Sequence, residues 1–95
     1  MTFVRLAFFP EATQRHFQKL ADVMPLDQRP PGRLLFAAGP VPGGWQVIQV
    51  WTSKDLLAAF NRDHFFPALA AVGGAAFPRP PVVTDFEPTV LKFED

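Results

Sequence analysis

The sequence predicts an α+β domain with the element order β-α-β-β-α-β, and three observations support this fold class. Short segments rich in β-branched and aromatic residues alternate with two segments of helical periodicity. Many of the eleven prolines and six glycines stand between these segments, in PLDQRPPGR, GPVPGG and FPRPP. Two of the expected strands are apolar on both faces. We expect residues 1–95 to form a single domain, because a chain of 95 residues supplies one modest core.

The N-terminal part of the chain predicts a strand over Thr2–Phe9 and a helix over Glu11–Met24. The strand segment alternates and is rich in β-forming residues. Pro10 suits the first turn of a helix, where its missing N–H would have no partner in any case. One arc of the expected helix is apolar and consists of Thr13, Phe17, Leu20, Ala21 and Met24.

The middle of the chain predicts two strands, Arg33–Ala38 and Trp45–Thr52, joined by a turn within GPVPGG. Ser53 follows the second strand and is expected to cap the N-terminus of a helix. The residue before a proline avoids the helical conformation. Pro67 is therefore expected to break this helix near Asp63–Phe66.

The C-terminal part predicts a short helical piece over Pro67–Val72, ended by Gly73 and Gly74. A last strand is expected over Val82–Phe93. Pro88 cannot donate a hydrogen bond to a neighbouring strand, so this strand is expected at an edge of the sheet.

This order predicts the ferredoxin-like arrangement, a four-stranded antiparallel sheet with both helices on one face. Right-handed crossovers place the first and third strands at the centre. Both central strands are apolar on both faces, and the pattern leaves open which face meets the helices. In the first strand, one face carries Phe3, Arg5, Ala7 and Phe9, and the other carries Val4, Leu6 and Phe8. In the third strand, one face carries Trp45, Val47, Gln49 and Trp51, and the other carries Gln46, Ile48 and Val50. Two helices cover one face only, so we expect a homodimer formed sheet to sheet.

Three segments carry a resemblance to a known family: VWTSKDLLAAF (Val50–Phe60), FFPALAAVG (Phe65–Gly73) and PPVVTDFEP (Pro80–Pro88). Together with the element order, they resemble the dimeric α/β-barrel superfamily and its small antibiotic-biosynthesis-monooxygenase-like proteins. The resemblance implies a dimer formed sheet to sheet, with a pocket between each sheet and its own helices. It also implies diverse chemistry, which includes cofactor-independent oxygenation of polycyclic phenols, haem breakdown and isomerisation.

The resemblance does not extend to haem degradation. Haem-degrading members of that superfamily carry a Trp, an axial His and an Asn. Matched on VWTSK, the corresponding positions of this chain are Phe60, Ala70 and Ala7. Oxygenases of polyketide phenols use Asn, Trp and Tyr, and this chain has no Tyr. We therefore expect no haem and no other cofactor.

His64 is the expected catalytic residue. A helix that continues past Phe60 places His64 on the same face as Leu57 and Phe60, at the mouth of the pocket. An imidazole there can act as a general base near neutral pH. The alternative is that His64 caps or packs at the break in the helix.

Arg5 is expected to bind substrate or to pair within the sheet. A guanidinium in a central strand is rarely buried without a partner. Arg5 can anchor an anionic group of a substrate, or it can pair with Asp85 or Glu87 of the edge strand. The ion pair is the favoured interpretation.

Gln49, Trp51 and Phe60 are also expected to bind substrate. A buried amide must be hydrogen-bonded, and Gln49 can satisfy this requirement through the protein or through a ligand. Trp51 either forms the floor of an aromatic pocket or belongs to the core. Phe60 lies on the apolar face of the second helix.

Composition excludes several other functions. The chain has no Cys, so disulfides, thiol catalysis and Cys-ligated zinc are absent. Nine basic and nine acidic residues are scattered, which argues against nucleic-acid binding. No apolar run suits a membrane span, and MTFVRLAFFPEA lacks the pattern of a signal peptide, so we expect a cytoplasmic protein. No metal-ligand set and no phosphate-binding loop occurs.

These observations predict a small cofactor-independent enzyme, monooxygenase- or isomerase-like, that acts on an aromatic or cyclic metabolite. The alternative is a non-catalytic ligand-binding or accessory homodimer. Convergence of His64, Arg5 and Gln49 on one cavity would favour the enzyme, and three separate locations would favour the accessory protein.

Overall fold

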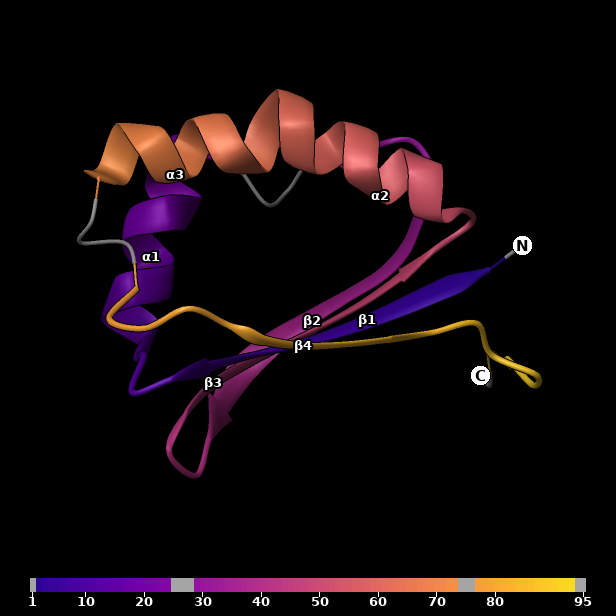
Figure 1. Ribbon diagram of the computed structural model, residues 1–95, viewed down its shortest axis with the longest axis horizontal. Helices are drawn as coiled ribbons and strands as arrows, with labels where there is room; N and C mark the ends of the chain where they lie inside the picture. Colours follow the sequence, from indigo (N-terminus) through magenta and orange to yellow (C-terminus); the bar gives the residue numbers. More distant parts are fainter. Residues whose placement is uncertain (1, 25–28, 74–76, 94–95) are drawn as a thin grey trace.

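A four-stranded antiparallel sheet forms one layer of the molecule, and the helices form a second layer on one of its faces (Figure 1). The computed structural model describes residues 2–24, 29–73 and 77–93. Its strands, in the spatial order β2-β3-β1-β4, are β1 (Phe3–Pro10), β2 (Arg33–Val41), β3 (Gly44–Trp51) and β4 (Val82–Phe86). The predicted ferredoxin-like arrangement, with the first and third strands at the centre, is confirmed.

The first helix begins later than the sequence predicts. Helix α1 spans Gln14–Val23, and Pro10 is the last residue of β1 rather than the first of the helix. The chain turns at Glu11, whose φ of 63° lies in the left-handed region and whose N–H donates to the carbonyl of Gly43 at 2.8 Å. Thr13 then caps α1. Its backbone N–H donates to His16 Nδ1 at 2.9 Å, so His16 serves the start of the helix.

The β2–β3 hairpin turns on Pro42 and Gly43. Strand β2 runs longer than expected, and β3 begins and ends one residue earlier than expected. Val41 pairs with Gly44, so the loop has two residues. Gly43 has a φ of 85°, and a Pro followed by a Gly of positive φ is typical of a type II turn. At the other end of β2 the register slips, because one extra residue, Leu34, stands between the pairs that Arg33 and Leu35 form.

A helical arm, residues 54–72, replaces the predicted helix–break–helix. It consists of α2 (Lys54–Phe60), the π-helical turn η1 (Asn61–Phe65) and α3 (Phe66–Val72). Within η1 the Phe66 N–H donates to the carbonyl of Asn61, five residues back. This wider turn lets the chain pass Pro67, which has no N–H and crowds the carbonyl four residues back, without leaving the helix.

The ends of the helical arm follow the prediction. The Ser53 hydroxyl accepts a hydrogen bond from the Leu56 N–H at 3.2 Å and caps α2. Gly73, with a φ of 78°, ends α3, and Gly74 lies outside the described residues. No helix in the described part of the chain is long and apolar enough to span a membrane.

Strand β4 lies at the edge of the sheet beside β1, as predicted, but it is shorter than the expected Val82–Phe93. It ends at Phe86, and Pro88 follows outside the ladder. A proline cannot donate to the neighbouring strand, so pairing stops before it.

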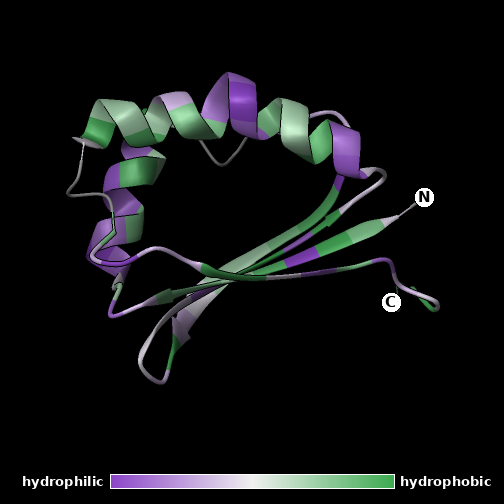
Figure 2. Ribbon diagram, in the orientation of Figure 1, coloured by the Kyte–Doolittle hydropathy of each residue, from purple (hydrophilic) through white to green (hydrophobic). Residues whose placement is uncertain are grey.

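The face of the sheet that carries Phe3 and Arg5 meets the helices. β1 and β3 pair Phe3 with Trp51 and Arg5 with Gln49, so these four side chains share that face. Figure 2 shows long hydrophobic stretches in the sheet and a hydrophilic turn in the middle of the helical arm. Two buried clusters lie between sheet and helices: Ala7, Phe9, Ala12, Trp45 and Val47 form one, and Phe3, Trp51 and Leu57 form the other.

Candidate functional site

A cavity of about 260 Å³ lies between the sheet and the helices, and we call it the sheet–helix cavity. Most of its lining is apolar and aromatic, as in small-molecule sites generally. Its apolar lining includes Ala7, Phe9, Phe17, Leu20, Phe36, Val47, Phe60 and Phe77, and its polar lining consists of Arg5, Arg33, Gln49 and Asn61.

Phe60 separates this cavity from a second hollow of about 470 Å³, which we call the outer groove. Phe60 and Met24 line both spaces. The ring of Phe60 lies 5.5 Å from the ring of Trp51 and 5.4 Å from that of His64, measured between centroids. The outer groove is further lined by Arg29, Pro30, Pro31, Asp63, His64, Pro67, Ala68 and Ala71, together with Val23.

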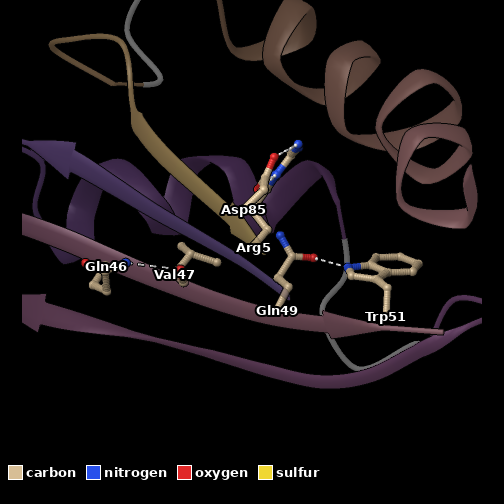
Figure 3. Close-up of polar contacts among 6 residues, drawn as sticks. All are labelled: Arg5, Gln46, Val47, Gln49, Trp51 and Asp85. Atoms are coloured by element: carbon tan, nitrogen blue, oxygen red, sulfur yellow. Dashed lines mark hydrogen bonds and ion pairs between the residues drawn. The ribbon is translucent and has the colours of Figure 1, made fainter. Parts of the chain in front are cut away.

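Arg5 lines the cavity and forms a bidentate ion pair with Asp85 of the edge strand, the favoured interpretation of its sequence position. Its Nε lies 2.8 Å from one carboxylate oxygen and its second guanidinium nitrogen lies 2.9 Å from the other (Figure 3). The hydrogen bond from Arg5 lowers the pKa of Asp85; burial opposes this shift, and the charges of Arg5 and Lys54 add to it. The guanidinium fork of Arg5 is thus engaged by the protein itself.

Gln49 lines the cavity with an amide whose orientation is fixed by Trp51. The indole Nε1–H donates to Gln49 Oε1 at 3.0 Å. An indole N–H cannot accept, so the amide oxygen must face Trp51 and the amide NH₂ must face the other way. Figure 3 shows this nitrogen pointing away from Trp51, on the side where Arg5 lies. Gln49 therefore presents two N–H donors toward the cavity.

Trp51 itself is fully buried and lies outside the lining of the cavity. It packs against Phe3 and Leu57 in the core. Trp51 therefore belongs to the core and does not form the floor of the pocket. From the core it orients the amide of Gln49.

His64 lies in the outer groove and not in the sheet–helix cavity. A regular α-helix would place His64 on the same face as Phe60. The π turn adds a residue and rotates the following side chains, so Asn61 and Phe65 line the cavity instead. His64 is exposed, and its ring lies against that of Phe60 at an interplanar angle of 37°.

Arg33 is a cavity residue that the sequence pattern does not reveal. It is 6% exposed, and its guanidinium carbon lies 4.8 Å from the ring centroid of Phe36 and 5.8 Å from that of Phe60. Burial lowers the pKa of Arg33, and the nearby charge of Arg29 lowers it further. Strict alternation would put Arg33 and Phe36 on opposite faces of β2. The extra residue at Leu34 brings both to the cavity side.

Arg5, Gln49 and Phe60 thus meet at one cavity, together with Arg33 and Asn61, while His64 occupies the adjoining groove. Over the residues that the structure describes, no three His, Asp or Glu side chains are grouped to hold a metal ion. The arrangement offers hydrogen-bond donors and positive charge to a ligand enclosed by aromatic rings.

Comparison with known proteins gives matches among solved structures. No family model matches the sequence, and no curated protein matches it. A proposed antibiotic biosynthesis monooxygenase from Caulobacter crescentus is similar over 94% of this chain and 91% of its own, with a TM-score of 0.70 and 20% identity. The chain has the fold of the antibiotic-biosynthesis-monooxygenase-like proteins. The resemblance noted in the sequence is confirmed at the level of the fold.

Two further structures show the range of proteins with this fold. A variant of SnoaB, a cofactor-independent oxygenase from Streptomyces nogalater, is similar over 98% of this chain and 96% of its own, with a TM-score of 0.63 and 21% identity. MhuD, a heme-degrader from Mycobacterium tuberculosis, is similar over 98% of this chain and 100% of its own, with a TM-score of 0.55 and 20% identity. One fold therefore accompanies different activities.

Proposed function

We propose that this protein is a small cofactor-independent enzyme, monooxygenase- or isomerase-like, that acts on an aromatic or cyclic metabolite in the sheet–helix cavity. The observation that carries the proposal is the cavity itself. It is enclosed by aromatic rings and holds a few oriented donors, among them the amide NH₂ of Gln49. The fold that the chain shares with SnoaB, a cofactor-independent oxygenase, supports it.

Both reaction types begin with loss of a proton from a carbon beside a carbonyl or phenol group. The electron pair left behind places negative charge on the substrate oxygen. Gln49 stabilises that oxyanion in the proposal, because Trp51 holds its amide with both N–H donors toward the cavity. An isomerase returns the proton to another carbon, whereas a monooxygenase lets the carbanion react with O₂.

His64 is the base in this proposal. It lies in the outer groove and is separated from the cavity by Phe60, which lines both spaces. A substrate that extends past Phe60 therefore brings a carbon atom within reach of the imidazole. Neutral imidazole accepts a proton near neutral pH.

A second copy of the chain completes the molecule in this proposal, by packing on the face of the sheet opposite the helices. Ile48 and Leu35 on that face are 37% and 38% exposed, and Phe86 of the edge strand β4, which pairs with Val4, is 48% exposed. A two-fold axis covers this apolar face with an identical one. We place the homodimer in the cytoplasm and assign it neither a nucleic-acid partner nor a membrane.

One observation favours a second candidate, a non-catalytic ligand-binding protein. Arg5 and Gln49 share a cavity, but His64 does not line it. A protein that only binds its ligand needs the cavity and no base in the groove.

Anthrone is a suitable probe, because oxidation at its acidic carbon consumes one O₂ and yields anthraquinone and one water. Under argon in D₂O, an enzyme should accelerate exchange of deuterium into that carbon. In air it should accelerate formation of the quinone, which is followed by absorbance. Gln49→Ala and His64→Ala should each slow exchange by about 10²-fold or more.

Arg62→Ala is the matched control, because Arg62 belongs to the same π turn and lines neither space. It should leave the rate unchanged. His64→Ala should also change the free energy of unfolding by less than about 0.5 kcal/mol, since the side chain is exposed. Binding of anthrone without exchange or oxidation would contradict catalysis and favour the ligand-binding protein.

A further inference from the structure

The first turn of α1, residues 14–17, is capped by an imidazole rather than by a carboxylate, and we call it the capped turn. His16 is the third residue of the helix, the position from which a Glu or Gln side chain usually reaches back to the N-cap residue. Here His16 Nδ1 lies 2.9 Å from the backbone nitrogen of Thr13 and 3.1 Å from its hydroxyl oxygen. The first turn contains no acidic residue. His16 therefore supplies the acceptor at this helix N-terminus.

This contact fixes the protonation state of His16. A backbone N–H can only donate, so Nδ1 must present its lone pair to Thr13, and the ring proton must be on Nε2. An imidazolium has a proton on both nitrogens and cannot accept. It would also place positive charge at a helix N-terminus and beside Lys19, three residues further on. The cap therefore needs the neutral imidazole, and histidine loses this form as the pH falls from about 8 to about 5.

The capped turn forms part of the wall of the sheet–helix cavity. Phe17 follows His16, lines the cavity and stacks on Trp45 of β3, with 5.3 Å between the ring centroids. Ala12, just before the cap, belongs to the same buried cluster as Trp45. Loss of the cap loosens the turn that carries Phe17, and it therefore loosens this wall of the cavity.

Two features beside the capped turn are costly in the closed arrangement. Glu11 has a φ of 63°, a conformation that is unfavourable for a residue with a Cβ. The indole N–H of Trp45 is buried and has no hydrogen-bond partner among the described residues. When the capped turn moves away, Trp45 can donate to water. Both costs reduce the free energy needed to open the turn, so the hydrogen bond to His16 has a large share in keeping it closed.

The charged groups around α1 do not stabilise an imidazolium at His16. In the described part of the chain no ion pair involves His16. The acidic residue nearest to it in sequence is Glu11, whose carboxylate is paired with Arg79. Helix α3, which packs against α1, and strand β3, which carries Trp45, contain no titratable side chain. The other charged side chains on α1, β1 and β2 are Arg15, Lys19, Asp22, Arg5 and Arg33.

We propose that His16 is a pH-sensitive switch of the cavity: its neutral imidazole holds the capped turn and Phe17 in place, and protonation releases them and weakens ligand binding. The switch rests on the proposed function, whose cavity it uses, and adds the regulation of that site. Its sign follows from the hydrogen bond. Protonation removes this bond from the folded protein and removes nothing from the unfolded chain. Stability and ligand affinity should therefore both fall as the pH drops from about 8 to about 5.

His16→Gln tests the switch, because Gln keeps an acceptor at the third helical position and does not titrate. Between about pH 8 and pH 5.5, the fall in Tm should be smaller by about 4 °C in His16→Gln than in the wild-type protein. His64→Gln is the matched control, because it removes the other of the two imidazoles from an exposed position. It should retain the fall in Tm of the wild-type protein.

Ligand binding is measured over the same pH range by isothermal titration calorimetry with 1-naphthalenemethanol, which is neutral throughout. The wild-type protein should lose about threefold or more in affinity on acidification, and His16→Gln should change by less than about 1.5-fold. Quenching of Trp fluorescence by acrylamide should increase on acidification in the wild-type protein and not in His16→Gln, because opening of the turn exposes Trp45. If His16→Gln does not fold, quenching and affinity of the wild-type protein at the two pH values decide the question.

Equal falls in Tm and affinity in the wild-type protein and His16→Gln would overturn the switch and leave the proposed function intact. A fall in Tm that depends on His16 without any change in affinity or quenching would also overturn it, because His16 would then only cap the helix. Failure of 1-naphthalenemethanol to bind at either pH would overturn the switch and the aromatic cavity together. The expected pH dependence of binding without turnover of anthrone would support the switch and contradict catalysis alone.

Discussion

The two faces of the sheet are both apolar in sequence, yet they differ in how their polar residues are used. On the face toward the helices, Arg5 and Gln49 each have a side-chain partner, Asp85 and Trp51. On the open face, which we define by Val4, Leu6, Phe8, Gln46, Ile48 and Val50, the Gln46 amide donates to a main-chain carbonyl of its own strand at 3.3 Å. On the helix side, polar side chains are therefore held in place by other side chains. Among the residues that define the open face, no polar side chain is held in this way.

The faces also differ in what shields them. Trp51 toward the helices is 0% exposed, whereas Ile48 on the open face is 37% exposed. Val4 and Val50 of the open face are buried within the chain, beside Phe86 and Leu35 of the flanking strands, which remain exposed themselves. The comparison teaches that one face is covered by the chain's own helices and borders a cavity, while the other stays open, with large apolar side chains exposed.

The largest expected effect comes from the helix-side face. Trp51→Ala removes a fully buried ring that packs on Phe60 and orients Gln49, and it should lower the free energy of unfolding by about 3–5 kcal/mol. Ile48→Ala on the open face removes a smaller side chain, which the proposed second copy covers, and should cost less, about 2 kcal/mol. Denaturant unfolding of both variants measures the difference. Equal losses would show that the two faces contribute alike and would break the comparison.

A smaller effect is expected at Gly32, which positions Arg33. Gly32→Ala places a Cβ at positive φ against Leu56 and should cost about 1–3 kcal/mol. Gly39→Ala, in the strand β2 that follows, is the matched control, because no atom lies within 4 Å of the added Cβ. Thermal unfolding of the two variants should separate them clearly. A neutral Gly32→Ala would contradict the tight approach of this loop to α2.

The smallest effect concerns the ion pair between Arg5 and Asp85. The native pKa of Asp85 is lowered from its ordinary value of 3.8, chiefly by the hydrogen bond from Arg5. At pH values above 3.8 the ion pair therefore contributes to the free energy of unfolding. This contribution is lost as the pH falls through the lower pKa that Asp85 has in the folded protein. Because the side chains are 25% and 32% exposed, the contribution should not exceed about 1 kcal/mol.

Unfolding measured between about pH 5 and pH 2 tests this expectation. Asp85→Asn should reduce the fall in the free energy of unfolding, the acid limb of the stability profile, between these pH values. Near pH 7, the free energy of unfolding should depend on pH in the same way as in the wild-type protein. Asp63→Asn is the comparison, because the Arg62–Asp63 pair is highly exposed, and it should change the limb less. An unchanged acid limb in Asp85→Asn would contradict the role of the pair.

Hydrophobic periodicity was sufficient to predict the element order. The right-handed crossovers then predicted the central strands, and Pro88 predicted the edge strand. The element order depends on which side chains are buried, and the spacing of apolar residues in the sequence shows this directly. The cap at Ser53 and the stop at Gly73 were also predictable, because each follows from a local backbone requirement.

The parts of the site that escaped prediction depend on shifts of a single residue. The π turn moves His64 out of the cavity and brings Asn61 and Phe65 into it. The extra residue at Leu34 brings Arg33 to the same face as Phe36. A prediction from periodicity assumes that every helix and strand keeps its regular repeat. It therefore cannot locate a π turn or a β-bulge, in which one inserted residue is stabilised by tertiary packing.

The open face gives the most direct test of the central claim, that one face of the sheet serves a ligand and the other serves a second copy of the chain. Sedimentation equilibrium at low micromolar concentration should give about twice the chain mass of 10.6 kDa. Ile48→Glu should shift the mass toward one chain, because a carboxylate would then be buried at the centre of the interface. A wild-type protein that sediments at 10.6 kDa with cooperative unfolding and native circular dichroism would contradict the claim.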